Sequence, residues 1–569
     1  MKFFEKKALF LLFFLCGPVC SFALDREAFS ITNYYLNLQV EPEQHRLGVR
    51  GKITLRNDTA APQKIAVLQI SSSLDWRAIR AGDKMLQFVT QPYTSDIDHT
   101  GSLSEAIITL PQEIAPHAMI DLNIAYEGVV LLDTTRLTRI GTPEDVAKNS
   151  DWDRIDEDFS AVRGVGYVTW YPIATESADL SEGNDLSEVL ARWNARESLS
   201  DMLLMFESTK DCTILFSGTK DRFVVTRDKP VKMGAFSVTQ RSGSVPTFVL
   251  ANYKTIDVKS NSAVNFLPAK ESIAASYADV LGNLDPLQRA TGLLSLQVAQ
   301  MPFSGAAPFV SDYLLLTPLQ PLTDESRLTL IYALARQKAA SPRPWISEGL
   351  AHFAQAFDIE QRHGRTAALE YLNAHRALLV DAESPHNNSD QVSATSRRSL
   401  VDTTDSMYLQ SKAMWVWWML RDMIGEASFN IVLFSYQSPD DKDPTYMPRL
   451  IAAHTQHDLQ WFFDDWVYHD RGLPDFKVES AFAATMPAKS YMLTITIDNL
   501  GTAGAEVPIT IKFTGGEVTK RIEVRAKSKA TFRVETPAAP QEIRVNDGSV
   551  PESNASNNVF KVEPVTPAK

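Results

Sequence analysis

The sequence predicts a multidomain α+β protein, in which an N-terminal antiparallel β domain is followed by a mostly helical domain and then by a C-terminal β-sandwich. Three observations support this prediction. The chain has 569 residues, which is too long for a single hydrophobic core. Its hydrophobic pattern changes to a helical period near residue 269. The pattern returns to strand-like alternation after residue 480.

The amino-terminal part carries short alternating segments of the kind that form strands. These segments span residues 34–40, 48–56, 64–70, 106–110 and 120–126. Turn residues such as Asn57-Asp58 separate them, and strand patterns return between residues 201 and 259. We therefore expect a β domain over residues 24–260.

Helical periodicity dominates the next part of the chain. The predicted helices span residues 269–284, 324–338, 345–357, 364–379, 409–424 and 459–469, and one strand pair at 294–301 and 312–317 interrupts them. Strand patterns then occupy residues 491–499, 507–513, 518–524, 530–534 and 543–545. These patterns predict a mostly helical domain over residues 261–478 and a small β-sandwich over residues 479–569.

The first 23 residues have the features of a secretory signal peptide. Three lysines precede an apolar run over residues 8–15, and Ser21 and Ala23 fit a cleavage site before Leu24. We expect cleavage to a secreted or periplasmic protein, with lipidation at Cys20 as the alternative. No later segment approaches the ~18 apolar residues that a membrane-spanning helix needs.

The composition restricts the classes of partner. The net charge is −13, and removal of three lysines and one glutamate with the signal peptide makes it −15. An acidic surface argues against nucleic-acid binding. Of the three cysteines only Cys212 lies beyond the signal peptide, so neither a disulfide nor a thiolate zinc site can form within the mature chain.

The most informative motif is W-I-S-E-G-L-A at residues 345–351. It resembles the W-L-N-E-G-F-A segment of the membrane alanyl aminopeptidase family, whose glutamate is a zinc ligand. Residues 412–425 resemble a later helix of this family, and L-Q-W-F-F at 459–463 with Trp466 resembles another segment. The resemblance implies a gluzincin, that is, a thermolysin-like peptidase domain over residues 261–478, and Glu348 as the only retained ligand-type residue.

The other parts of such a zinc site are missing. The site needs two histidines at i and i+4 on one helix face, with a glutamate base directly after the first. Aligning the preceding helix with the family's zinc helix places Tyr332 and Arg336 at the histidine positions and Ala333 at the base. A register that keeps the family's longer spacing to the third ligand places Glu325 and Thr329 there instead. No histidine in the chain precedes a glutamate.

Two further positions follow from the resemblance. Gly305 and Ala306 keep the start of the family's G-A-M-E-N substrate-binding segment, which here has lost its glutamate. Alignment of Lys412 with the family's lysine places Gln410 at the transition-state tyrosine, and Tyr408, two residues upstream, is the candidate to replace it.

Arg336 suggests how Glu348 could be accommodated without a metal ion. If its side chain projects toward the zinc position, a guanidinium–carboxylate pair would replace the metal–carboxylate bond. The alternative is that Arg336 lies on a solvated helix end. A separation of more than about 4 Å between the two groups would exclude the pair.

We therefore expect a catalytically degenerate, exported aminopeptidase-like protein, which acts as a peptide- or protein-binding or scaffold protein and needs no cofactor. The competing hypothesis is an active zinc metallopeptidase, with zinc held by Glu348, His352 one helical turn later, and another histidine. Packing of His352 beside Phe353 is the simpler explanation of that histidine.

Overall fold

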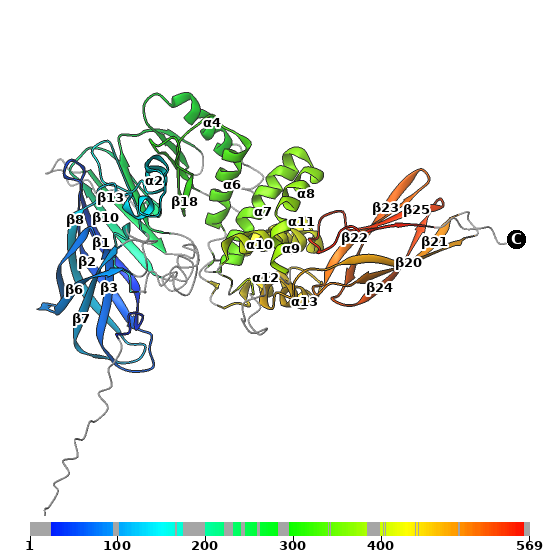
Figure 1. Ribbon diagram of the computed structural model, residues 1–569, viewed down its shortest axis with the longest axis horizontal. Helices are drawn as coiled ribbons and strands as arrows, with labels where there is room; N and C mark the ends of the chain where they lie inside the picture. The colour runs from blue at the N-terminus through cyan, green and yellow to red at the C-terminus, as the bar shows by residue number, and fades with distance from the viewer. Residues whose placement is uncertain are drawn as a thin grey trace, which may run out of the picture.

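The computed structural model describes residues 24–94, 102–164, 168–174, 200–220, 232–239, 245–258, 262–282, 295–338, 341, 343–383, 399–401, 403, 405–437, 440–441, 443–486 and 490–562. The predicted signal peptide at residues 1–23 lies outside this part of the chain. Figure 1 shows β structure at the amino-terminal end, helices in the middle and β structure again at the carboxyl end. The multidomain α+β prediction is confirmed at this level.

An eight-stranded sheet is the largest element of the amino-terminal region, with the order β12-β13-β10-β1-β2-β8-β4-β5. Its neighbouring strands are antiparallel except β1 and β10, which run parallel. The prediction of a purely antiparallel domain was wrong for this pair, because a long intervening segment lets β10 return to the sheet in the direction of β1. The strands are β1 (Phe29–Glu41), β2 (Arg46–Asn57), β4 (Leu74–Ala81), β5 (Lys84–Met85), β8 (Met119–Val129), β10 (Asp201–Ser208), β12 (Thr219–Lys220) and β13 (Lys232–Thr239).

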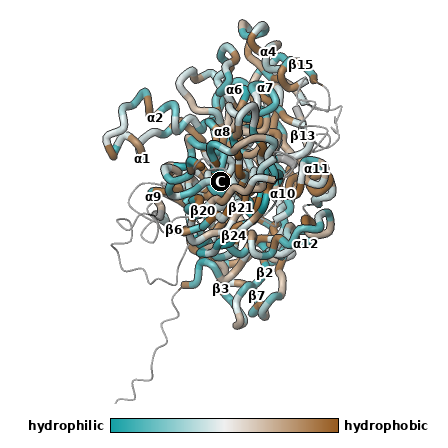
Figure 2. Tube along the Cα trace, turned by 90° about the vertical axis from the view of Figure 1, so that its right-hand side faces the viewer, coloured by the Kyte–Doolittle hydropathy of each residue, from teal (hydrophilic) through white to brown (hydrophobic). Residues whose placement is uncertain are grey.

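Two three-stranded sheets pack with it, in the orders β3-β7-β6 and β11-β14-β9. Leu36, Leu68 and Phe248 come from the three sheets and belong to one buried core cluster. The short helices α1 (Thr135–Thr138) and α2 (Glu144–Ser150) lie to one side of the molecule in Figure 2. The strands are β3 (Gln63–Ser71), β6 (Gln87–Thr94), β7 (Ser102–Ile114), β9 (Phe159–Arg163), β11 (Thr213–Phe216) and β14 (Thr247–Ala251).

A five-stranded sheet of order β15-β16-β17-β19-β18 precedes most of the helices. The central strands β16, β17 and β19 are parallel, and both edge strands are antiparallel. The predicted strand pair is therefore part of a larger sheet, and the expected boundary between residues 260 and 261 falls between the paired strands β15 and β16. We propose that the boundary lies before Lys254. The strands are β15 (Lys254–Asp257), β16 (Ala263–Phe266), β17 (Gln297–Gln300), β18 (Phe309–Ser311) and β19 (Leu314–Thr317).

The helices occupy the middle of the chain. They are α4 (Glu271–Gly282), α6 (Asp324–Lys338), α7 (Pro344–His363), α8 (Arg365–Ala374), α9 (Arg376–Glu383), α10 (Ser406–Ile424), α11 (Glu426–Ser435), α12 (Tyr446–Ala452) and α13 (Gln460–Phe463), and a π-helical turn, η6 (Asp464–Tyr468), follows. The predicted helix at 364–379 is two helices that meet at His375. Helices α7 and α10 approach closely at Gly349, where a Cβ atom would lie 2.7 Å from the Trp417 ring and 2.8 Å from the Ala413 Cβ.

Two antiparallel sheets form the carboxyl-terminal β-sandwich, in the orders β20-β21-β24 and β23-β22-β25-β26. The strands are β20 (Phe476–Thr485), β21 (Tyr491–Asn499), β22 (Ala505–Phe513), β23 (Gly516–Val524), β24 (Lys529–Thr536), β25 (Pro540–Val545) and β26 (Val559–Lys561). Strand β20 was not predicted, and the expected domain start at residue 479 falls inside it. We propose Phe476 as the start. In the described part of the chain, no helix is both long and apolar enough to cross a membrane.

Candidate functional site

Helices α6 and α7 pack against each other in an antiparallel pair, and polar contacts join them at successive turns. The Arg336 and Tyr332 side chains both contact Glu348. Further along the pair, the contacts are Gln355 to the Leu328 carbonyl, Arg327 to Asp358, and Arg362 to Asp324. The register predicted from the aligned motif therefore places positions 332 and 336 opposite Glu348, as expected for two residues at i and i+4.

The Glu348 carboxylate is engaged at both oxygens. The Tyr332 hydroxyl donates a hydrogen bond of 2.6 Å to Oε2. The Arg336 guanidinium forms an ion pair with Oε1, and the two side chains are only 8% and 13% exposed. The predicted Arg336–Glu348 pair is confirmed, and the alternative of a solvated helix end was wrong. Such a charge-assisted contact neutralises a carboxylate that would otherwise be poorly solvated.

Tyr332 donates a hydrogen bond to Glu348 and does not itself carry a negative charge. Burial raises the pKa of its phenol above the ordinary value of 10.0, and the nearby positive charge of Arg336 only partly opposes this effect. The hydroxyl therefore keeps its proton at neutral pH and donates a hydrogen bond to Glu348. Ala333, which the alignment placed at the general base, is fully buried in the hydrophobic cluster that also contains Leu330 and Leu334.

His352 lies one turn after Glu348, and its ring centroid is 5.0 Å from that of Tyr332. Its Nδ1 atom is 2.9 Å from Gln355 Oε1, which also accepts from the Tyr371 hydroxyl at 3.1 Å. The Gln355 amide nitrogen donates to a backbone carbonyl at 3.0 Å, so Oε1 is an acceptor and His352 Nδ1 must carry the proton. Among the residues that the structure describes, none is a hydrogen-bond partner of the buried His352 Nε2.

Burial keeps the His352 imidazole neutral. Desolvation lowers its pKa to about 4, the hydrogen bond to Gln355 partly opposes this effect, and electrostatic interactions with His375 and Arg336 add to it. Sequence reasoning missed Gln355 and Tyr371, which orient this ring. The only available signal was the position of Gln355 three residues after His352, on the same helix face.

The donor set around Glu348 does not match a zinc site. A catalytic zinc site has three protein ligands and leaves a fourth position open. Here the Arg336 guanidinium and the Tyr332 hydroxyl engage both Glu348 oxygens, and Arg336 brings a positive charge next to the carboxylate. Within the described residues, no group of three or more His, Cys, Asp and Glu side chains is arranged to hold a metal ion.

Tyr408 lies in the first turn of α10, whose N-cap residue Asp405 accepts a hydrogen bond from the Tyr408 amide. Its hydroxyl donates to Asp470 and accepts from Lys412 Nζ at 3.0 Å. Lys412 also forms an ion pair with Asp470, and its side chain is only 1% exposed. Tyr408 therefore belongs to a half-buried polar cluster with Lys412 and Asp470.

Gly305 and Ala306 lie in the turn before β18 and contact the amino-terminal region. A Cβ atom at Gly305 would lie 2.5 Å from the Asn149 side chain. Ala306 is buried in a cluster with Trp152 and Phe159, whereas Ala333 belongs to a different cluster. Trp152 also meets Phe309 of β18 edge-to-face, with ring centroids 5.9 Å apart. This turn therefore joins two regions of the molecule.

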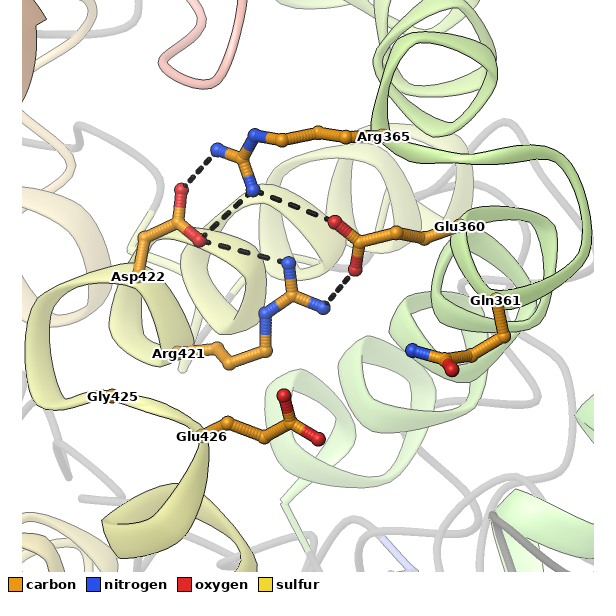
Figure 3. A pocket seen from close by; sticks show the side chains of 7 residues that line it. All are labelled: Glu360, Gln361, Arg365, Arg421, Asp422, Gly425 and Glu426. Carbon is orange, nitrogen blue, oxygen red and sulfur yellow. Dashed lines mark hydrogen bonds and ion pairs between the residues drawn. The ribbon is translucent and has the colours of Figure 1, made fainter. Parts of the chain in front are cut away.

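A pocket of about 420 Å³ lies where α7, α8, α10 and α11 meet (Figure 3). An ion network forms one side of it: Arg421 pairs with Glu360, and Arg365 pairs with Asp422 at 2.6 Å. The Arg421 guanidinium also lies 4.2 Å from the Trp418 ring centroid. The lining residues are Glu360, Gln361, Arg365, Arg421, Asp422, Gly425 and Glu426.

Comparisons with known proteins give a result at the level of fold. No protein-family profile and no curated protein sequence matches the chain. Among solved structures, the M1 zinc metallopeptidase from Deinococcus radiodurans is 16% identical with a TM-score of 0.50, and the match covers 77% of this chain and 94% of that one.

A glutamate-to-alanine mutant of the Deinococcus radiodurans enzyme is 15% identical with a TM-score of 0.51, again over 77% of this chain and 94% of that one. A two-domain M1 zinc metallopeptidase mutant bound to L-tryptophan gives 15% identity and a TM-score of 0.51, over 78% and 94% of the two chains. The chain therefore has the fold of the M1 zinc metallopeptidases. The resemblance predicted from its scattered motifs is confirmed at the level of fold.

Proposed function

We propose that this protein is an exported, catalytically degenerate relative of the zinc aminopeptidases that acts as a peptide- or protein-binding or scaffold protein. One observation carries the proposal: Arg336 and Tyr332 occupy both oxygens of Glu348, the single ligand-type residue that the motif retains. The ion pair provides the counter-charge that a metal would provide in an active relative.

The chemistry of hydrolysis supports the same conclusion. A zinc ion lowers the pKa of its bound water to about 7 and so supplies a nucleophile at neutral pH. A full structural zinc site contributes about 10 kcal/mol or more of binding free energy, and one carboxylate supplies only a fraction of it. Ala333 offers no proton acceptor at the position of the base, and it is buried in the core.

Export and ligand class are supported by separate observations. The lysines, apolar run and small residues of positions 1–23 fit a signal peptide. A neighbour of the same fold was crystallised with L-tryptophan, which is the basis for expecting a ligand of peptide chemistry. The acidic composition disfavours nucleic acid as the partner.

The first test measures metal and activity together. The mature protein is purified without chelator, bound zinc is measured by mass spectrometry, and a mixed library of aminoacyl and internally quenched peptides is assayed. We expect no stoichiometric zinc, no hydrolysis, and binding of a subset of the peptides. Stoichiometric zinc with chelator-sensitive hydrolysis would overturn the proposal.

A second test restores the missing ligands. Because Tyr332 and Arg336 face Glu348, the double variant Tyr332→His/Arg336→His should place two imidazoles beside the carboxylate. We expect this variant to bind zinc while the native chain does not, and to remain inactive because Ala333 is unchanged. The same double variant with Glu348→Gln is the matched control, and zinc binding by the control would show that the site lies elsewhere.

The competing function is an active zinc metallopeptidase with other ligands, and His352 is the observation that favours it. Its Nδ1 proton is fixed by Gln355, and its Nε2 lone pair has no hydrogen-bond partner within the described part of the chain. Burial lowers the pKa of His352, so the imidazole stays neutral at pH 7 as a ligand must. Under this hypothesis, His352→Ala removes bound zinc from the purified protein, whereas under our proposal it leaves the metal content unchanged.

A further inference from the structure

We propose that the β-sandwich of residues 476–562 is an integral wall of the helical domain, which holds α10 and, through it, α7 in place. This inference goes beyond the proposed function and does not depend on it. A sandwich attached as a separate binding module would have its own core and a small, polar contact with the helices. Here a cluster of buried apolar side chains runs from the helices into the sandwich, and hydrogen bonds and ion pairs accompany it across the contact.

The two regions share one hydrophobic core. A single cluster of buried side chains contains Trp345 of α7, Trp417 of α10 and Ile495, Val507 and Val545 of the sandwich strands. The amino-terminal sheets have a different cluster. Because burial of apolar surface is the main driving force of folding, a continuous core makes the helices and the sandwich stabilise each other.

The turn between β21 and β22 binds the π-helical turn η6. The Trp466 indole nitrogen donates to the Gly504 carbonyl at 2.7 Å, and the Gly504 amide donates to Asp465 Oδ2 at 2.9 Å. A Cβ atom at Gly504 would lie 3.1 Å from the Trp461 ring, so the absence of a side chain favours this close approach of the backbone. Arg525 of the sandwich also contacts this region, with its guanidinium 4.3 Å from the Trp461 ring centroid.

A buried ion pair between Lys412 and Asp470 connects this region to α10. Lys412 of α10 lies 5.5 Å from the centroid of the Trp466 ring and pairs with Asp470, which lies two residues after η6 in the chain. Helix α10 in turn packs on α7 at Gly349, which is adjacent to Glu348. The sandwich therefore supports the helix against which the Glu348 segment rests.

A second set of contacts lies at the opposite end of α10. Asp422 accepts from Arg365 of α8 and from Arg521 of β23, the latter at 3.4 Å. Arg365 also lies 3.7 Å from Asp547 of the sandwich. Arg376 of α9 donates to the Glu552 carbonyl at 2.7 Å. The side of the pocket in Figure 3 that carries Arg365 and Asp422 is thus tied to the sandwich.

The experiment measures whether a destabilising substitution inside the sandwich also destabilises the helices. Ile511 is fully buried in β22, seven residues beyond Gly504 and so roughly 23 Å along the strand from the contact with η6. In the full chain, Ile511→Ala should raise the rate of hydrogen–deuterium exchange in the sandwich by about tenfold or more. The rates in α10 and α7 should rise by the same factor. The matched control is Ile108→Ala, which is equally buried in β7 of the amino-terminal core and should leave α10 unchanged.

A milder variant, Ile511→Val, covers the case in which Ile511→Ala does not fold. Trp466→Phe tests the contact between the sandwich and η6, because it removes the hydrogen bond to the Gly504 carbonyl but keeps an aromatic ring. We expect it to speed exchange in both α10 and β22. If the Ile511 variants loosen residues 476–562 while exchange in α10 and α7 stays at the native rate, the sandwich is an independent module and the inference is wrong.

Discussion

At the scale of single residues, the site is defined by how Glu348 is neutralised. Tyr332 and Arg336 were identified from the spacing of the aligned motif, and the structure places both in contact with Glu348. The sequence could indicate this because i and i+4 positions of a helix necessarily share a face. It could not indicate Tyr371, since its hydrogen bond to Gln355 depends on how α7 and α8 pack, and for Gln355 the only signal was its position three residues after His352.

Removal of the Arg336 charge should destabilise the fold by leaving Glu348 with one partner. We expect Arg336→Met to lower the free energy of unfolding by about 2 kcal/mol, measured by urea denaturation at neutral pH. The double variant Arg336→Met/Glu348→Gln should lose less than the single variant, because no unpaired charge remains. Equal losses in the two variants would show that the unpaired Glu348 charge does not cause the loss in the single variant.

His352 predicts a pH dependence of stability. Its pKa is lowered from the ordinary 6.5 to about 4 in the folded protein, so the unfolded chain binds a proton between these values that the folded chain does not. Stability should therefore fall as the pH drops from 6.5 to 4, by up to about 3 kcal/mol from this residue. His375, whose pKa burial also lowers, acts in the same direction.

The variant His352→Gln measures this contribution. Its stability loss between pH 7 and pH 4, followed by urea denaturation, should be smaller than that of the native protein by the amount that His352 supplies. His363→Gln on the exposed end of the same helix is the control. A native-like pH profile of the His352 variant would show that this ring does not supply the pH dependence.

At the scale of elements, sequence patterns located the helices better than the sheets. Helix α6 begins and ends at the predicted residues 324 and 338, because acidic residues open its first turn and a proline follows at residue 342. The parallel pairs β16–β17 and β17–β19 join strands that are distant in sequence, and no local pattern reports such pairing. Strands β4 and β20 were missed because a register shift in each, at Trp76/Ala78 and at Val478/Ser480, changes the phase of the alternation within the strand. Strand β6 was missed because it is mostly polar and contains Pro92.

The close approach of α7 and α10 gives a prediction at this scale. Gly349→Ala would place a Cβ within 2.8 Å of both Trp417 and Ala413, so one helix must shift. We expect a loss of about 2 kcal/mol in unfolding free energy and a shift in the tryptophan emission maximum. Gly282→Ala at the end of α4 is the control, since its nearest contact would be an ordinary 3.6 Å. Equal stability of the two variants would contradict the tight contact.

At the scale of the whole molecule, the sequence predicted the order of the three regions, and the structure adds how they are joined. The predicted boundaries fell between paired strands at β15–β16 and inside β20, because a change in hydrophobic period does not coincide with the edge of a sheet. The sequence carries no local pattern for the core that the helices and the sandwich share. It also carries none for the ion pairs that cross between them.

The ion pairs of Asp422 with Arg365 and Arg521, which link the helices to the sandwich, give a prediction at this scale. Asp422→Asn removes a charge that Arg365 and Arg521 share, and its own side chain is only 9% exposed. We expect the unfolding free energy of the full chain to fall by about 2 kcal/mol, and the loss to shrink little in high salt because the Asp422 carboxylate is shielded from solvent. Asp75→Asn, which affects an exposed pair with Arg77, is the control and should leave stability unchanged.

The doubly engaged Glu348 carboxylate also bears on the evolutionary history of the site. A mutation of Arg336 to histidine removes the counter-charge before a second imidazole is present to complete a metal site, and a mutation of Tyr332 removes the other donor. Each first step toward metal binding therefore lowers stability, and natural proteins have little stability to lose. Under the proposed function, loss of the metal ligands would act as a ratchet, because the reverse path begins with variants that selection removes.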